Sequence, residues 1–571
     1  MPDGAPVPDP RTAPIPYLPL EQHGVIGNGR TAALVAADGT VDWLCAPDFD
    51  GTVLFGALLD VQRGGFWRVG PAVRRVGVQH YDTDNRLSTR WTNNEYELVV
   101  TDALGPGPAV VRRVECLRGS VRCGSRIQLA VNFSPVDWRQ CSPPLHAWSS
   151  CGAFGIEGGT MQLLAGDSVW LTLSSEGAPI SDDEACARLF SIPHDRPGAR
   201  ASGHPLTRSE MVLRTLQYAP TGAMVAAPTT SIPERIGGGW NVDYRLCWVR
   251  DSSLAMTALI RLGDRGPAER YLKWLTTLGS QHTAPLQTLY DIRGGERPTR
   301  RERRDLEGYR GSKPVRFGNH AFRQLQLDIF GYLADCALTL IEAGGICPPE
   351  VWQLLETCAR FVADHWREPD HSLWELPAMR HYTSSRVMCW VTLDRVTRIG
   401  AHLSQPVDKG WADTASAIRD EVLAAGWNAA MGAFTQTLGG RTLDASALLI
   451  PIYGLLPAGD PRVLATIDRI ADRLTIDGFV YRFDPTTMPE LDQIPLGESE
   501  GAFVPCTLWL ATVYRLLGRT RVADAIVGAI DQVAGSTGLL GEAVDPRTKT
   551  FAGNFPLGFS HAEYIRTAFT S

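Results

Sequence analysis

Two glutamates in the second half of the chain have the surroundings that acid–base catalysis requires. Glu375 lies in HSLWELPAMRHY and Glu542 in GLLGEAVDP, and each stands between a short apolar run and a loop-like segment. Two carboxylic acids that face one cavity can divide the proton transfers of glycosidic bond cleavage between them. Most glutamates are solvated surface residues, so the assignment depends on the motifs around these two.

Composition limits the class of protein. The chain has 571 residues, of which 44% are hydrophobic and 20% charged, which predicts a soluble globular protein of two or more domains. The net charge of −7 and the lack of a basic patch argue against a nucleic-acid partner. The sequence shows neither a secretory signal nor an apolar run of roughly 18 residues. We therefore expect a cytoplasmic protein with no membrane partner.

The cysteines and aromatic residues carry further expectations. The 12 cysteines are scattered without CxxC pairs or His-rich ligand spacing, which predicts reduced thiols, no metal site and no cofactor. Cys141 and Cys151 flank a loop and could pair, although nothing in the sequence requires it. The 16 Trp and 14 Tyr could offer flat faces to sugar rings, but core packing is the default role for each.

The pattern of the chain changes once, near residue 200. Residues 1–16 are rich in proline and predict a flexible arm. Residues 17–191 carry short β-rich runs between Gly, Asp and Asn turns, which predicts an antiparallel β-sandwich domain. Residues 192–206, which include DRPGARASGHP, are expected to be a linker. Residues 207–571 then form a helical domain.

The helical domain contains a series of segments with apolar residues at three- and four-residue spacing. They are 208–217, 252–262, 268–279, 319–343, 349–366, 384–403, 409–425, 444–455, 461–474, 501–517, 521–534 and 560–568. Several of the loops between them are long, and long loops in a compact domain are usually functional. This arrangement fits an all-α barrel whose inner helices point their ends at a central cavity.

Separated motifs give the chain a resemblance to glycoside hydrolase family 15, which includes bacterial glucoamylases and actinobacterial trehalases. The motifs are VIGNGRTAALVAADGTVDWLCAPDFD, APTTSIPERIGGGWNVDYRLCWVRDSS, LEGYRGSKPVRFGNHAFRQLQLDIFG, LWELPAMRHYTSSRVMCWVTLDR, ESEGAFVPCTLWL and GLLGEAVDPRTKTFAGNFPLGFSHAEY. They stand in the family's order, from about residue 18 to the C-terminus. The resemblance implies an N-terminal β-sandwich, an (α/α)6 barrel and inverting, exo-acting hydrolysis at a terminal glucose.

The resemblance also implies roles for individual residues. Glu375 matches the general acid, which must carry a proton, and Glu542 matches the general base, which must be ionised. Arg250 and Asp251 in CWVRDSS match the pair that grips the outer hydroxyls of the terminal glucose. An aspartate accepts hydrogen bonds from vicinal hydroxyls and an arginine donates in a fixed fork. The alternative for Asp251 is a helix N-cap.

Other residues are weaker candidates for substrate binding, and each has an ordinary structural alternative. They are Asp243 and Tyr244 beside the CWVRD motif, Trp374 before the acid, Arg316 in the basic loop GYRGSKPVRFGNH, Arg482 in VYRF, and His561 in FSHAEY. The basic loop, which also holds Arg310 and Lys313, could bind phosphate or form a rigid rim. Asn319 and Gln324 are candidates for polar contacts near the sugar. Glu500 is a rival base, although a glutamate at a helix start more often complements the helix dipole.

The chain departs from the family pattern beside the expected site. Relatives commonly read RNWDYRYCWLRD where this chain has Trp240, Val242 and Leu246, so an arginine and two aromatic residues are missing from familiar positions. After Glu375 the chain reads Leu-Pro-Ala at 376–378, where relatives commonly have VRG, and proline fixes the backbone there. The catalytic pair is kept while the sugar-contacting wall changes, which bears on the substrate more than on the chemistry.

Three hypotheses follow. The first is an α-glucosidase-type hydrolase of trehalose or short α-glucans. The second is the same fold acting on another substrate, such as a glycosylated metabolite or a non-sugar acid–base cyclisation. The third is a non-catalytic carbohydrate-binding or regulatory protein, against which the presence of both glutamates counts. The expected partner is a small carbohydrate or glycosylated small molecule, and the sequence leaves a homo-oligomer open.

Overall fold

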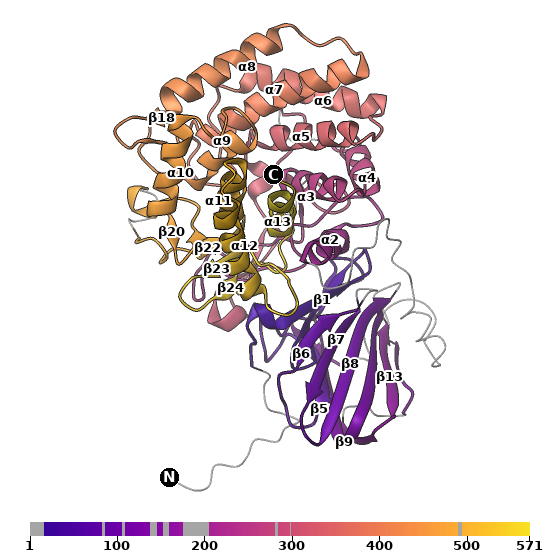
Figure 1. Ribbon diagram of the computed structural model, residues 1–571. Coiled ribbons are helices and arrows are strands. Elements are labelled where there is room, and N and C mark those ends of the chain that lie inside the picture. The colour runs from indigo at the N-terminus through magenta and orange to yellow at the C-terminus, as the bar shows by residue number, and fades with distance from the viewer. Residues whose placement is uncertain are drawn as a thin grey trace. The chain divides into compact units, whose positions relative to one another are not determined.

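The computed structural model describes residues 16–82, 86–105, 109–137, 146–151, 159–174, 205–279, 284–296, 299–488 and 494–570. By their contacts, residues Met1–Asp195 and Arg304–Val315 form one compact unit, and Arg196–Arg303 with Arg316–Ser571 form a second (Figure 1). The division after Asp195 falls within the expected linker. The expected arm and linker lie almost wholly outside the described residues, as does Cys141 of the possible disulfide.

The second unit is not continuous in sequence, which differs from the expected single domain over 207–571. The segment Arg304–Val315 groups with the first unit because its side chains pack there. The Tyr309 hydroxyl donates to the carbonyl of Leu18 at 2.9 Å, and the Tyr309 ring meets that of Tyr17 edge to face. Arg310 and Lys313 of the basic loop belong to this segment, whereas Arg316 belongs to the second unit.

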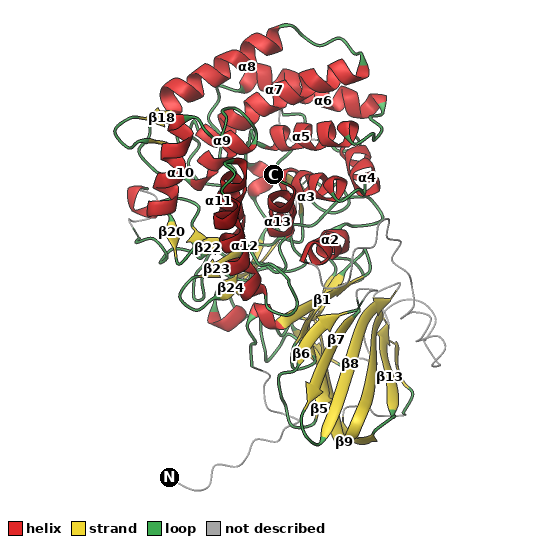
Figure 2. Cartoon of the chain, in the orientation of Figure 1, coloured by secondary structure: helices red, strands yellow, loops and turns green. Residues whose placement is uncertain are grey.

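The first unit is an antiparallel β-sandwich, as predicted (Figure 2). Its strands are β1 (His23–Gly27), β2 (Ala32–Ala36), β3 (Thr40–Ala46), β4 (Thr52–Phe55), β5 (Phe66–Pro71), β6 (Val78–Tyr81), β7 (Leu87–Thr92), β8 (Tyr96–Gly105), β9 (Ala109–Val131), β10 (Ser134–Val136), β11 (His146–Ser149), β12 (Gly159–Leu164) and β13 (Ser168–Ser174). The described strands of this unit form one hydrogen-bonded sheet, in which the long strand β9 pairs with several others. Its first half pairs with β8 and β13, and its second half pairs with β5 and β12.

The second unit is helical, and its helices follow the predicted series (Figure 2). They are α2 (Pro205–Leu216), α3 (Val249–Arg261), α4 (Gly266–Leu275), α5 (Ile329–Glu342), α6 (Pro349–His365), α7 (Thr383–Leu403), α8 (Gly410–Glu421), α9 (Leu449–Ile452), α10 (Pro461–Arg473), α11 (Val504–Leu516), α12 (Thr520–Ala534) and α13 (Gly558–Phe569).

Alternate helices close into an inner ring. Helix α3 packs on α5, α5 on α7, α7 on α9, α9 on α11, α11 on α13, and α13 returns to α3. The outer helices α2, α4, α6, α8 and α12 each pack against members of this ring, and α10 packs on the turn before α9. Burial follows this arrangement, since α3 is buried almost all round. Outer helix α10 buries one stripe at three- and four-residue spacing. The unit is therefore an (α/α)6 barrel.

Two predicted helices are shorter than the apolar pattern suggested. Helix α5 begins at Ile329 rather than near 319, because residues 319–328 form a loop with a single 3-10 turn at Ala321–Arg323. The segment expected at 444–455 is a 3-10 turn, η6 (Ala445–Leu448), followed by the short α9. Pro451 lies inside that segment and lacks the N–H that a continuous α-helix would need.

Candidate active site

The candidate residues gather where the chain enters the inner helices. Helix N-termini leave backbone N–H groups unpaired and carry partial positive charge, so they favour carboxylates. Asp251 lies in the first turn of α3, Asp328 is the N-cap residue of α5, and Asp444 is the N-cap residue of η6. Glu375, Glu500 and Glu542 lie further upstream, in the segments that lead to α7, α11 and α13. The loops that precede the inner helices therefore bring together residues that are far apart in sequence.

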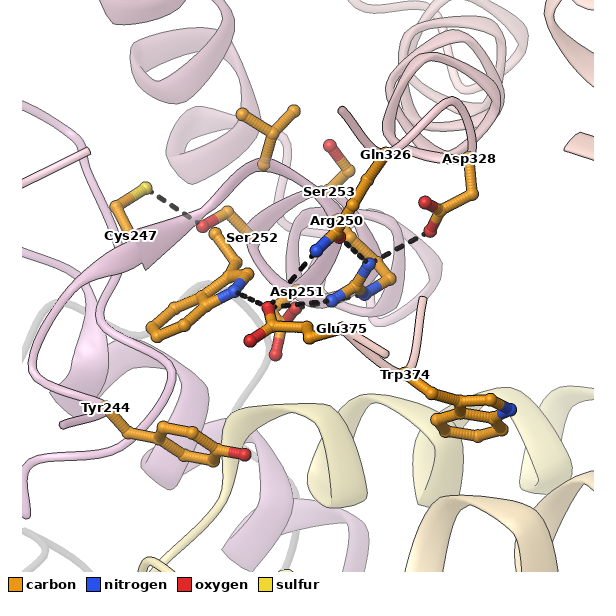
Figure 3. Close-up of polar contacts among 12 residues, drawn as sticks. Tyr244, Cys247, Arg250, Asp251, Ser252, Ser253, Gln326, Asp328, Trp374 and Glu375 are labelled. Carbon is orange, nitrogen blue, oxygen red and sulfur yellow. Dashed lines mark hydrogen bonds and ion pairs between the residues drawn. The ribbon is translucent and has the colours of Figure 1, made fainter. Parts of the chain in front are cut away.

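Glu375 is held at one oxygen atom. The Trp248 indole N–H donates to its Oε1 at 2.6 Å, the Gln326 amide donates to the same atom at 3.4 Å, and the Arg250 guanidinium lies 3.9 Å away (Figure 3). The backbone of Glu375 has a φ of 57°, a left-handed conformation that a non-glycine residue keeps only where its surroundings enforce it. Its side chain is still 27% exposed. Among the described contacts, Oε2 is the oxygen left for a ligand.

Glu542 is buried and held at both oxygens. The Tyr244 hydroxyl donates to Oε1 at 2.5 Å, and the backbone N–H of Asn554 donates to Oε2 at 3.0 Å. A β-carbon at Gly553 would overlap the Glu542 carboxyl group, so that position requires a glycine. Burial raises the pKa of Glu542 to about 7, although Tyr244, Arg482 and Asn554 favour the ionised form.

One aromatic pair connects the two glutamates. The rings of Tyr244 and Trp248 meet nearly edge to face, with centroids 5.4 Å apart. Tyr244 donates its hydroxyl to Glu542, and Trp248 donates its indole N–H to Glu375. The two carboxyl groups that the sequence singled out therefore lie at the two ends of one rigid aromatic unit. Trp248 was not among the predicted site residues, although it stands in the CWVRD motif.

Arg250 and Asp251 lie beside Glu375, as Figure 3 shows. Arg250 donates to the Gln326 amide oxygen at 2.8 Å and pairs with Asp328 at 3.0 Å, and its distance to Asp251 is 3.5 Å. Among the described residues, the buried Oδ2 of Asp251 accepts no hydrogen bond. Burial raises the pKa of Asp251 to about 6, against the lowering effect of Arg250.

The N-cap alternative for Asp251 does not match its position. Trp248 is the N-cap residue of α3, and Asp251 lies three residues later in the first turn, where its carboxyl group receives a backbone hydrogen bond. The buried Oδ2 lies 3.5 Å from the Arg250 Nε but accepts no hydrogen bond from the described residues, so a hydrogen bond from a ligand would offset part of its desolvation cost. The Asp251 carboxyl group is therefore suited to accept hydrogen bonds from hydroxyl groups of a ligand.

Arg482 joins two further carboxylates. Its Nε donates to Glu500 at 2.8 Å, and its Nη2 pairs with both Glu500 and Glu234. The guanidinium also stacks near Trp240 and Trp374, at 5.8 Å from each ring centre. Glu234 was missed from the sequence, although it stands in the quoted motif SIPERIGGG. Its sequence signal was weak, since Glu234 and Arg235 stand as a charged pair in a segment otherwise built of small and apolar residues.

Two predicted binding residues are committed to backbone or ion-pair contacts. Asp243 accepts from the Arg245 side chain at 2.9 and 2.8 Å and from the Gly318 N–H at 2.8 Å, so it fixes the loop that carries Tyr244. Arg316 donates to the carbonyls of residues 239 and 241, at 2.7 and 2.9 Å, and to the Glu302 carboxylate at 3.1 Å. Arg316 thus clamps the chain on both sides of Trp240, which fits the rim alternative.

Trp374 and His561 are packed inside the barrel. The Trp374 indole donates to both oxygens of Asp444, at 3.1 and 2.9 Å. Figure 3 shows the Trp374 side chain directed away from Asp251. His561 is fully buried, accepts from the Leu540 N–H at 3.0 Å and contacts the Ser209 hydroxyl at 2.9 Å. Both ring nitrogens of His561 have protein partners, so the core alternative describes this residue.

The weaker polar candidates, Gln324 and Asn319, also make contacts within the protein. The Gln324 amide donates to the Glu375 carbonyl at 3.3 Å and its oxygen accepts from Gln326 at 2.8 Å, so it supports the loop that holds the acid candidate. Asn319 accepts from the Ala321 N–H at 2.9 Å. Gln326, which contacts both Arg250 and Glu375, was missed because the apolar pattern placed it inside a predicted helix.

The three positions at which this chain departs from the family pattern before α3 differ in exposure. Trp240 is 45% exposed, and Val242 is partly buried, with its carbonyl accepting from the Asn554 side chain at 3.0 Å. Leu246 is 4% exposed and packs in a core cluster with Trp248 and Leu289. The expectation that Leu246 belongs to the sugar-contacting wall is therefore corrected, because its side chain is enclosed by other apolar residues.

The described residues contain no group of three or more His, Cys, Asp and Glu residues that could hold a metal ion. No helix within those residues has both the length and the apolar character that crossing a membrane demands.

The comparisons with known proteins agree with this architecture. The profile of glycosyl hydrolases family 15 matches residues 206–523 and 519–569, and a trehalase-like N-terminal profile matches residues 16–137. A trehalase of Mycolicibacterium smegmatis is 32% identical, over 97% of this chain and 93% of its own length. Trehalase 1 of Sulfolobus acidocaldarius is 31% identical, over 96% of this chain and 98% of its own length.

A solved structure shares the fold of the whole chain. It is a bacterial glucoamylase complexed with acarbose, with a TM-score of 0.65 over 97% of this chain and 94% of that one. Its sequence identity is 13%, so it bears on the fold alone. The profile match over more than half of the chain, together with relatives above 30% identity along nearly its full length, shows that this protein is a glycoside hydrolase and belongs to glycosyl hydrolases family 15.

Proposed function

We propose that the protein hydrolyses an α-glucosidic bond of trehalose or a short α-glucan with inversion, using Glu375 as general acid and Glu542 as general base. The observation that carries this proposal is the placement of the two carboxyl groups at opposite ends of the Tyr244–Trp248 pair. Trehalose is the preferred substrate in this proposal because the relatives that align over nearly the full chain are named trehalases.

The contacts of the two glutamates suit different proton roles. The neighbours of Glu375 engage Oε1, which leaves Oε2 to carry a proton to the leaving oxygen. Glu542 is oriented by Tyr244 and Asn554 and retains unused lone pairs that can accept a proton from water. In an inverting site that water attacks from the face opposite the leaving group.

Arg250 and Asp251 supply the exo specificity in this proposal. The buried Oδ2 of Asp251, which accepts no hydrogen bond from the described residues, would accept hydrogen bonds from hydroxyls of the terminal glucose. Arg250, fixed by Gln326 and Asp328, holds Asp251 and Glu375 in one arrangement. A wall built in this way ends the sugar site and leaves no room for chain extension.

Product analysis tests the proposal. With α,α-trehalose, attack by water on one anomeric carbon should release one β-glucose and one α-glucose in equal amounts. NMR in the first minutes, before mutarotation, measures this ratio, and a panel of α-linked disaccharides and oligosaccharides ranks the substrates by kcat/KM. Release of α-glucose alone would mean retention and would refute the inverting mechanism.

Val242 provides a test of substrate choice. The Val242→Trp change should restore a large flat surface beside the loop of Asn554 and Glu542. Stacking of that kind is worth about 0.5–1.5 kcal/mol, so kcat/KM for a simple α-glucoside should rise about 2- to 12-fold. Val522→Trp, at a 45% exposed position on outer helix α12, is the matched control. Unchanged activity on every sugar of the panel would show that residue 242 does not face the site.

The exposed Trp240 favours a second candidate, a substrate with a larger group beyond the glucose. Trp240 is held by the Arg316 clamp and lies over the Arg482 guanidinium, so a flat face stands fixed above the buried cluster. Glycosylated small molecules with an aromatic or second sugar ring should therefore be included in the panel. A higher kcat/KM for such a glycoside than for trehalose would favour this second candidate.

A further inference from the structure

A buried cluster of carboxylates surrounds Arg482, next to the proposed base. Arg482, Glu234 and Glu500 are each 7% exposed, and Glu542 is 1% exposed. The Nη2 atom of Arg482 pairs with both Glu234 and Glu500. Aromatic rings close the guanidinium off, with Phe503 at 5.5 Å and Trp240 and Trp374 at 5.8 Å.

The backbone fixes this cluster to Glu542. The carbonyl of Glu234 accepts from the Gly501 N–H at 2.9 Å, and the carbonyl of Pro233 accepts from the Gly553 N–H at 2.8 Å. Strands β22 (Ala502–Phe503) and β23 (Ala543–Asp545) pair, which places the segments that follow Glu500 and Glu542 side by side. The segment of Glu234 is thus tied to both of the loops that carry the other two carboxylates.

The cluster has more acidic groups than its cation can balance. Three carboxylates and one guanidinium would carry a net charge of −2 if all were ionised, and like charges in a buried site oppose ionisation. The two groups that donate hydrogen bonds to Glu542, the Tyr244 hydroxyl and the Asn554 backbone N–H, are neutral. Burial and repulsion by Glu542 and Glu500 raise the pKa of Glu234 to about 8, despite Arg482. Burial raises the pKa of Glu542 to about 7.

We propose that Glu234 is a positioning residue of the hydrolytic site: it holds the proton that this buried cluster must retain, and it thereby allows Glu542 to be ionised. Glu234 acts through Arg482 and does not touch the substrate. In its neutral form it still accepts a hydrogen bond from Arg482 while Glu500 keeps the ion pair. This inference rests on the proposed function, because it treats Glu542 as the base.

The Glu234→Gln change imitates the protonated state at every pH. It keeps the size of the side chain and an oxygen for Arg482, but it cannot ionise. Because Glu234 is already neutral at the pH where Glu542 titrates, the acid limb of the pH profile of kcat/KM on trehalose should stay near pH 7, as in the unaltered protein. Arg482→Lys removes the fork that reaches both carboxylates and should move the limb upward. Glu421→Gln is the control. Glu421 ends α8 and pairs with Arg386 of α7, so this change should leave the acid limb in place.

A stability measurement tests the same proton without any substrate. Because the pKa of Glu234 is raised from its ordinary 4.5 to about 8, the folded protein holds a proton between these values that the unfolded chain has released. The Tm should therefore fall as pH rises from about 5 to 8, and Glu234→Gln should make that fall less steep by about one linked proton. Glu421→Gln should keep the slope of the unaltered protein.

The two measurements separate the possible failures. An unaltered protein that cleaves no α-glucoside would refute the proposed function, while the slope of Tm against pH would still decide the role of Glu234. In Glu234→Gln, an unchanged slope of Tm against pH would overturn the inference, and so would an acid limb that moves well below pH 7, because Glu234 would then be ionised when Glu542 titrates. If Glu234→Gln does not fold, Arg482→Lys decides the matter. In that variant, an acid limb that stays in place or moves downward would overturn the inference.

Discussion

Glu375→Gln should lose about 10²–10⁴-fold in kcat/KM on trehalose and regain most of its rate with α-glucosyl fluoride. Glutamine keeps the shape of the side chain and an oxygen for the Trp248 indole, but it has no proton to give to the leaving oxygen. Fluoride leaves without protonation, so the missing proton no longer limits the reaction. Steady-state rates on the two substrates, with Glu421→Gln as control, measure the difference.

Glu542→Gln should lose a similar factor on both substrates. The attacking water needs a base whichever group leaves, and a glutamine held by Tyr244 and Asn554 cannot take its proton. Full activity in this variant would point to Glu500 as the base. The structure gives Glu500 another task, since it accepts from both Nε and Nη2 of Arg482. Circular dichroism should show both variants folded, because neither removes volume from the core.

Asp251→Ala should weaken transition-state binding by about 2–4 kcal/mol, which is about 30- to 1,000-fold in kcat/KM. The change leaves hydroxyls of the bound sugar without an acceptor in a desolvated pocket. Arg250 keeps its contacts with Gln326 and Asp328, so the wall itself should persist. The loss should appear on trehalose and on α-glucosyl fluoride alike, since both present the same glucose.

A stability control separates this role from helix capping. If Asp251 served mainly to support the start of α3, Asp251→Ala would lower Tm and leave kcat/KM intact. Asp328→Asn is the matched comparison for Tm. It changes another buried carboxylate at a helix start, one that pairs with Arg250. A Tm loss with unchanged kcat/KM in Asp251→Ala would refute the binding role.

Much of the fold could be predicted from the sequence because its signals are local. The strand runs of the first unit and the helices of the second follow hydrophobic periodicity, which reflects the face that each element buries. The order of the motifs identified the family and selected Glu375 and Glu542 from among many acidic residues. The predictions failed at element ends, as at residues 319–328, where an apolar pattern is a loop that carries Gln326.

The tertiary structure decided which candidates share one site. The sequence alone determined the two-part architecture and the family, and it selected the two glutamates as candidates, because these depend on local patterns and motif order. It could not show that Tyr244 and Trp248 link the glutamates, that Arg482 is bound by Glu234, or that His561 is enclosed. Those relations join segments up to 352 residues apart, as Ser209 and His561 are, and arise only when the inner ring closes. A residue's type permits a role, but its burial and its partners decide whether that role is open to it.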